Sequence, residues 1–187
     1  MKILCICPSK YPKKLDKMMD SFLITRSKHT KIILNYENKS ITSIFNEEFE
    51  KHPDYDFYFM ANDDILFETP LWDLKLANKC KISYGDDGFQ GENLCTFPMI
   101  DGDIVRALGW LQMPLLKRYS GDVVWKYIGE RCGILNYCKD VIITHKWEGC
   151  SDPELNIKDM SNFIRWLPNS YKDIIKIKNH LGKEIKT

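Results

Sequence analysis

Two adjacent carboxylates, Asp63 and Asp64, follow a short apolar and aromatic run at residues 57–61. The run has the composition of a buried strand, so the two acids are expected at its carboxyl end. Ligands of parallel α/β sheets bind at this end of the strands, and Mg²⁺ takes carboxylate ligands together with substrate phosphates. The pair therefore predicts a metal and nucleotide site at the edge of an α/β sheet. The competing interpretation is that the two aspartates only begin a surface turn.

The first half of the chain alternates between strand and helix patterns. Apolar runs predict strands at residues 2–7, 31–36 and 57–60. Helical spacing predicts one helix at residues 13–25 and a second that begins after an N-cap at Ser40 and runs through Phe49. The order strand, helix, strand, helix, strand is typical of a parallel sheet with covering helices.

The second half is less regular. A helix is expected from Pro70, and a Gly- and Asp-rich loop at residues 85–91. Further elements are expected as strands at 81–84, 94–100 and 134–144 and as helices at 103–108 and 122–129. Gly109 and Gly133 are the expected C-caps of the last two helices.

Bulk composition is that of one globular domain. The chain has 187 residues, 44% of them hydrophobic and 28% charged, and its net charge is +1. This charge gives no bulk argument for nucleic-acid or membrane binding. No apolar run approaches the ~18 residues of a membrane-spanning helix, and the apolar N-terminus is too short for a signal peptide. A cytoplasmic location is expected.

Seven scattered cysteines fit reduced thiols in such a compartment. Cys132, Cys138, His145 and Cys150 do not have the tight spacing of a structural zinc site. Buried free cysteine is the favoured interpretation.

The tail, residues 158–187, is more basic than the rest, with seven Lys or Arg against three Asp or Glu, a net charge of +4. One interpretation is a solvated helix that packs an apolar stripe on the core. The other is a basic strip that faces a polyanionic acceptor or a membrane surface.

Several short motifs, taken in order over residues 2 to about 147, resemble GT-A type nucleotide-sugar glycosyltransferases of the family-2 kind. Pro8-Ser9 follows the first strand, and Asn62-Asp63-Asp64 stands where that family has its DXD-like motif. Gly121-Asp122-Val123-Val124-Trp125 resembles an Asp-x-x-Trp element, and a later strand ends in His145. Asn62 is a departure, because the family often has an acid there. The chain resembles most closely the small single-domain versions common in phages and other viruses, for which the location would be the host cytoplasm.

The resemblance implies a single α/β domain with a GT-A-like (Rossmann-like), mostly parallel central sheet and helices on both faces. Residues 1–150 would form the catalytic domain, with a nucleotide-binding half at 1–65 and an acceptor half at 66–150. Residues 151–187 would be a basic helical tail packed on it.

The resemblance also suggests a role for each candidate residue. Asp64 and His145 would hold Mn²⁺ or Mg²⁺, and Asp122 would be the general base at a helix start, where the helix dipole favours a negative charge. The expected contacts to the nucleoside-diphosphate sugar come from Pro8, Ser9, Tyr11, Asn35, Glu37, Asn46 and Asp63. The expected contacts to the acceptor come from Asp86, Asp87, Trp110 and Trp125.

Each assignment has a structural alternative. Asp122 could be a plain helix cap, His145 a core histidine, the pair Asp86 and Asp87 a turn, and the tryptophans core residues.

The activity implied is hexosyl or pentosyl transfer to a hydroxyl with inversion. The basic tail suggests a hydroxymethylated pyrimidine in DNA as the acceptor. The competing functions are a metal-dependent nucleotidyltransferase or nuclease and a catalytically inactive binding module. The sequence does not predict an oligomeric state.

Overall fold

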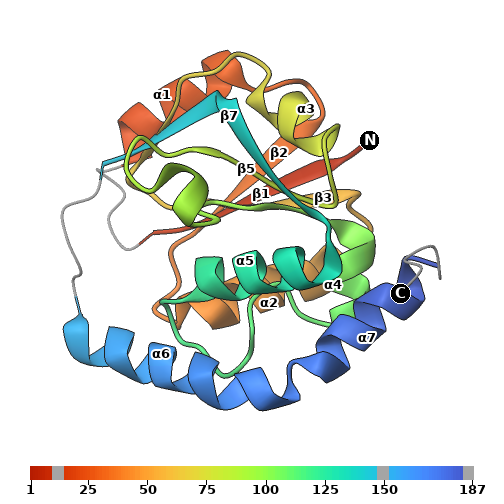
Figure 1. Cartoon of the computed structure of the whole chain (residues 1–187). Coiled ribbons are helices and arrows are strands. Elements are labelled where there is room, and N and C mark those ends of the chain that lie inside the picture. Colours follow the sequence, from red (N-terminus) through yellow and green to blue (C-terminus); the bar gives the residue numbers. More distant parts are fainter. Residues whose placement is uncertain (10–14, 147–151, 183–187) are drawn as a thin grey trace.

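The computed structural model describes residues 1–9, 15–146 and 152–182. A central sheet separates two layers of helices (Figure 1). Helices α1 and α3 cover one face, and α2, α4 and α5 cover the other. Helices α6 and α7 form an outer layer on the side of α5 and α4.

The sheet has seven strands in the order β2-β1-β3-β6-β5-β7-β4. Their bounds are β1 Ile3–Pro8, β2 Thr30–Asn35, β3 Phe57–Met60, β4 Ile65–Phe67, β5 Ile82–Asp86, β6 Met99–Asp101 and β7 Leu135–His145. Strands β1, β2, β3, β5 and β7 run in one direction, and β6 and β4 pair antiparallel with their neighbours. The expected α/β architecture with a mostly parallel sheet is confirmed.

The helices begin and end close to their sequence signals. Their bounds are α1 Leu15–Thr25, α2 Ile41–Lys51, α3 Trp72–Ala77, α4 Gly102–Leu108, α5 Gly121–Cys132, α6 Pro153–Trp166 and α7 Tyr171–His180. Ser40 caps α2, because its side chain accepts a hydrogen bond from the backbone N–H of Ser43. Gly109 and Gly133 end α4 and α5 with φ angles of 79° and 68°, the left-handed conformation that glycine adopts without steric cost.

Three expectations differ from the structure. Strand β4 is missing from the sequence prediction, because three residues are too short to show a period. Strand β5 continues through Gly85 and Asp86, which were expected in a loop, because it pairs with β7. Residues 94–98 are not strand, and β6 begins at Met99.

Two apolar cores hold the layers together. On the side of α1 and α3, Phe22, Phe59, Phe67 and Trp72 form one aromatic group, and the Phe67 and Trp72 ring centroids are 4.6 Å apart. The opposite core packs α2, α4 and α5 against the sheet. The tail contributes Phe163, Trp166 and Ile177 to this second core as two helices joined at Leu167–Asn169.

A buried carboxylate joins α3 to the start of β2. Asp73 is fully buried, and its Oδ2 accepts hydrogen bonds from the Ser27 backbone N–H at 2.9 Å, the Ser27 hydroxyl at 2.6 Å and the Thr30 hydroxyl. No cation in the described ranges forms an ion pair with this carboxylate, and backbone and hydroxyl donors stabilise its charge.

Replacement of Asp73 by alanine is expected to lower the free energy of unfolding by about 3 kcal/mol, because it leaves buried donors unpaired. Urea denaturation measures this difference. Asp16→Ala is the matched control, since Asp16 also lies in the first turn of a helix but is exposed; its effect should stay below about 1 kcal/mol. Equal effects of the two substitutions would contradict the role given to the buried carboxylate.

Candidate active site

The candidate site lies where β1, β3 and β7 end, at the left edge of the sheet in Figure 1. Ser9 follows β1, and its hydroxyl donates a 2.6 Å hydrogen bond to Oδ2 of Asp63, which follows β3. Pro8 is the register partner of Asn35 at the end of β2. The structure thus brings the Pro-Ser segment and the acid pair together, as the sequence predicts.

Asp64 and His145 face each other across the pairing of β4 with β7. The His145 Nε2 lies 3.4 Å from Oδ2 of Asp64, and the backbone N–H of Lys146 donates to the carbonyl of Asp64 at 2.7 Å. The ring of Phe97 packs edge-on against the imidazole at 5.0 Å between centroids. Residues 81 positions apart therefore form one pair.

The residues at this pair fit a divalent cation. The Oδ1 atom of Asp64 is buried and has no hydrogen-bond partner among the residues that the structure describes, although such an atom normally has one. One carboxylate and one imidazole suit Mn²⁺ or Mg²⁺, which would take further oxygen ligands from a diphosphate and water. Among the described residues, no three His, Cys, Asp or Glu side chains gather as a complete metal site. The chemistry of the pair therefore fits a cation that arrives with a substrate.

Two of the cysteines that were considered for a zinc site from the sequence can also be placed in the structure. Cys132 and Cys138 are buried free thiols, as expected, and burial raises the pKa of both. Cys150 lies outside the described residues.

Asp122 lies in the first turn of α5 and is partly buried. Burial raises its pKa above the usual range of an aspartate, and the nearby charge of Asp87 raises it further. The backbone N–H of Val123, which donates to Oδ1 at 2.9 Å, and the charge of His145 oppose this rise. Asp122, Asp87 and His145 thus share one electrostatic neighbourhood, and Asp122 has the raised pKa that suits a general base.

Asp86 ends β5, and Asp87 organises the bend that follows, which is the structural alternative given for this pair. Oδ1 of Asp87 accepts backbone hydrogen bonds from Phe89, Gln90 and Gly91 at 2.6–3.0 Å. The carbonyl of Asp87 accepts the backbone N–H of His145 at 2.9 Å. Asp87 is 1% exposed, and its Oδ2 has no hydrogen-bond partner, so one oxygen of this buried carboxylate is unused.

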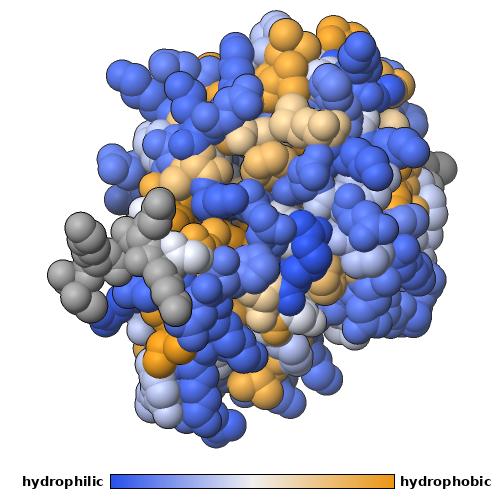
Figure 2. Space-filling model, turned by 90° about the vertical axis from the view of Figure 1, so that its right-hand side faces the viewer, coloured by the Kyte–Doolittle hydropathy of each residue, from blue (hydrophilic) through white to orange (hydrophobic). Residues whose placement is uncertain are grey.

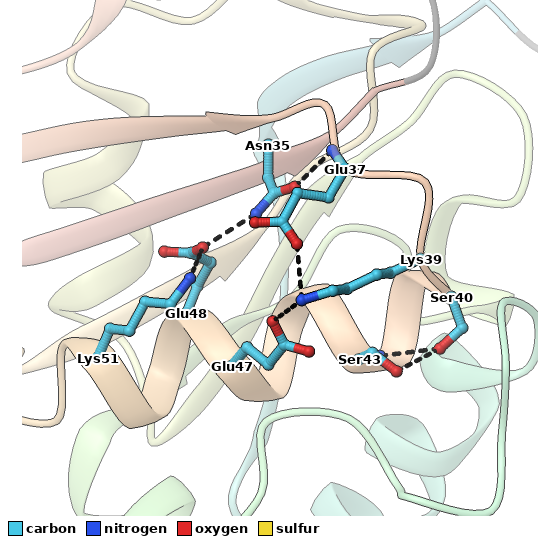
Figure 3. A network of polar contacts seen from close by, with 8 residues as sticks. All are labelled: Asn35, Glu37, Lys39, Ser40, Ser43, Glu47, Glu48 and Lys51. Atoms are coloured by element: carbon cyan, nitrogen blue, oxygen red, sulfur yellow. Dashed lines mark hydrogen bonds and ion pairs between the residues drawn. The ribbon is translucent and has the colours of Figure 1, made fainter.

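Polar contacts between the end of β2 and α2 hold Asn35 and Glu37 in place (Figure 3). The side chain of Asn35 donates to Glu48 at 3.0 Å and accepts the backbone N–H of Glu37 at 2.9 Å. Lys39 lies 2.7 Å from the Glu37 carboxylate and lowers its pKa. Asn35 therefore has a fixed orientation beside Ser9, whose backbone N–H donates to the Asn35 carbonyl.

Three other candidates make contacts with the segment between α4 and α5 or with each other. Asn46 accepts the backbone N–H groups of Leu111 and Gln112 and donates to the Gln112 carbonyl. Trp125 is fully buried, and its indole N–H donates to the Leu111 carbonyl at 3.0 Å. Trp110 is 8% exposed and packs on Trp125. These residues fix the segment between α4 and α5. Trp110 and Trp125 are therefore core residues, the structural alternative given for them. Tyr11 lies outside the described residues.

One residue that positions the site, Asp159, is not among the residues predicted from the sequence. Asp159 of α6 is fully buried, and its carboxylate accepts the backbone N–H groups of Lys117, Arg118 and Tyr119 at 2.8–3.2 Å. This segment leads directly into α5 and Asp122. In the sequence, Asp159 is indistinguishable from a surface charge of the tail.

The chain was compared with protein families, curated proteins and solved structures. No protein-family model matches the chain, and no curated protein matches it. Among solved structures, A197 from STIV is similar with a TM-score of 0.54 and 14% identity, covering 79% of this chain and 87% of that one. A mutant of Drosophila β1,4-galactosyltransferase 7, in complex with manganese, UDP-Gal and xylobiose, is similar with a TM-score of 0.50 and 12% identity, covering 82% and 78%. A glycosyltransferase involved in glycosylation of the major capsid of PBCV-1 has a TM-score of 0.46 and 11% identity, covering 88% and 100%.

The likeness to the galactosyltransferase mutant shows a shared fold. The expected GT-A-like fold is thereby confirmed. Within the described residues, no helix is both long enough and apolar enough to cross a bilayer.

Because burial disfavours the charged form of Asp122, Asp122→Asn is expected to unfold at higher urea concentration than the natural protein at pH 7 in metal-free buffer. The difference in stability between the variant and the natural protein should shrink as the pH falls through the raised pKa of Asp122. The natural carboxyl group then becomes neutral in the folded protein, like the amide of the variant. Urea denaturation at several pH values measures it.

The matched control is Asp103→Asn in the first turn of α4. A hydrogen bond from Arg106 lowers the pKa of Asp103, so its replacement should slightly lower stability at pH 7, the opposite sign. A destabilising Asp122→Asn would contradict the electrostatic role given to burial at that position.

Proposed function

We propose that the chain is a metal-dependent glycosyltransferase that moves a sugar from a nucleoside-diphosphate sugar to an acceptor hydroxyl. The observation that carries this proposal is the meeting of Asp64 with His145, beside the Ser9–Asp63 hydrogen bond, at the strand ends of a GT-A-like sheet. Support also comes from the shared fold with a galactosyltransferase that was solved with manganese and UDP-Gal.

Asp64 and His145 would hold the cation, and Mn²⁺ or Mg²⁺ would neutralise the leaving diphosphate when bound. Asp63, oriented by Ser9, would accept hydrogen bonds from the ribose or from water. Pro8, Asn35 and Glu37 line the neighbouring strand ends on the donor side, where Tyr11 is also proposed to lie against the base. Asn46, whose side chain binds the backbone of Leu111 and Gln112, is likewise proposed for the donor side.

Asp122 would remove the proton from the acceptor hydroxyl. The acceptor oxygen then forms a bond to the anomeric carbon while the bond from that carbon to the diphosphate oxygen breaks, and the proton stays on Asp122. Attack opposite to the leaving group inverts the anomeric configuration. A raised pKa makes Asp122 a better base near neutral pH than an ordinary aspartate.

Asp86 and Asp87 are proposed to contact acceptor hydroxyls. A hydroxymethylated pyrimidine in DNA remains the acceptor hypothesis, and such binding would weaken steeply as salt is added. The proposal covers hexosyl and pentosyl donors alike. A nucleotidyltransferase or nuclease would use the same acids without any sugar donor, and an inactive binding module would turn over no donor at all.

Thermal stability against a panel of nucleoside diphosphates is expected to rise only when Mn²⁺ or Mg²⁺ and one matching nucleotide are both present. At ~100 times Kd the ligand stabilises the folded state by roughly 2.7 kcal/mol. Asp64→Ala should abolish this shift. Asp140→Ala, which removes an exposed acid in β7, is the control and should retain it. The absence of a shift with every nucleotide and metal would overturn the proposed donor site.

Asp122→Asn is expected to lower the transfer rate by about 10²–10⁴-fold, because it removes the base, while the nucleotide-dependent thermal shift remains. In the natural protein, kcat/KM should fall as the pH decreases through the raised pKa of Asp122. Product formation from a labelled donor, measured across pH, tests both statements. Unchanged transfer by Asp122→Asn would exclude it as the base.

A further inference from the structure

Helix α6 presents a row of apolar side chains away from the core. Ile157 and Ile164, seven residues apart, are 68% and 59% exposed, and Met160 between them is 38% exposed. On the other side of the helix, Asp159, Phe163 and Trp166 are buried. Single exposed apolar residues are ordinary, but a row at helical spacing opposite the buried side marks a contact surface.

Helix α7 extends this pattern. Tyr171 and Ile175, one helical turn apart, are 55% and 49% exposed, whereas Ile177 is buried. We call these five exposed residues of α6 and α7 the outer apolar row. Figure 2 shows apolar patches between hydrophilic residues in the lower part of the molecule, the height at which α6 and α7 lie in Figure 1.

Cations lie to one side of the outer apolar row. Lys158 and Arg165 each follow an isoleucine of the row by one position on α6, and Lys172 follows Tyr171 on α7. All three are exposed, and no carboxylate within the described residues pairs with them. A fourth cation nearby, Lys176, does have an acidic neighbour, with its Nζ 3.6 Å from Asp173. An exposed apolar row with unpaired cations at its side is the pattern of helices that lie in the interface of an anionic membrane.

We propose that α6 and α7 dock the protein on an anionic lipid bilayer, with the outer apolar row in the interfacial region and the flanking cations at the lipid phosphates. The proposal is independent of the proposed transfer reaction.

A second copy of the chain fits this surface less well. In an antiparallel pair of α6 helices, two-fold symmetry places the cations of both copies on the same side of the contact. Lys158 and Arg165 of the two copies would then repel each other.

Nucleic acid also fits less well. Phosphate binding needs cations at the centre of a surface, and here the centre is occupied by isoleucine and methionine.

Vesicle flotation at physiological salt tests the proposal. One set of vesicles contains phosphatidylcholine alone, and the other contains roughly 30% phosphatidylserine, an anionic lipid. The natural protein should float with the anionic vesicles and much less with the neutral ones. The variants I157S/I164S and K158Q/R165Q should each weaken binding by at least about tenfold. The control L23S/I24S removes an equally exposed apolar pair from α1 and should bind like the natural protein.

Melting temperatures confirm that each variant folds, and all substituted side chains are exposed. The proposal is overturned if the natural protein does not float or if both α6 variants float unchanged. It is also overturned if sedimentation shows a dimer that I157S/I164S disrupts, or if the row proves to hold DNA through Lys158 and Arg165. None of these measurements involves a sugar donor, so failure here is distinguishable from failure of the proposed transfer reaction.

Discussion

The antiparallel pairing of β4 with the end of β7 is the constraint on which the site depends. Ile65 is the register partner of His145, so the residue before Ile65 is brought against the imidazole. Since a shift of one residue would turn every side chain of the strand to the opposite face, the register itself selects this pair. A strand of only three residues thus determines which groups can share a cation.

Carboxylates of the described residues differ in how their oxygens are bound. Asp73 and Asp159 accept hydrogen bonds from backbone and hydroxyl donors, whereas the buried Glu48 and Asp101 pair with Lys51 and Lys81. Within the described part of the chain, Oδ1 of Asp64 and Oδ2 of Asp87 are buried without a hydrogen-bond partner. Because unsatisfied buried oxygens destabilise a fold, the position of these two oxygens near His145 supports the proposed site.

The local pattern of the sequence predicts most strands and helices, since apolar period, the Ser40 cap and the terminal glycines act over short distances. It also assigns Ser9 and Asp63, through the family resemblance, to the same donor contacts, and the two side chains form a hydrogen bond. It does not predict β4, nor the burial of Asp159 and Trp125, because these depend on contacts between distant segments. A carboxylate that binds backbone N–H groups has no pattern of its own in the sequence.

The hydrogen bonds from residues 117–119 to Asp159 also have a consequence for synthesis of the chain. During translation, the segment before α5 emerges some 40 residues ahead of the aspartate that receives its amide hydrogens. Its donors remain with water until α6 has left the ribosome, although the strands and helices of the first half can already associate. The segment that leads into α5 is therefore held in place last, after the strand ends that carry Ser9 and Asp63, so Asp122, the proposed base, is positioned late.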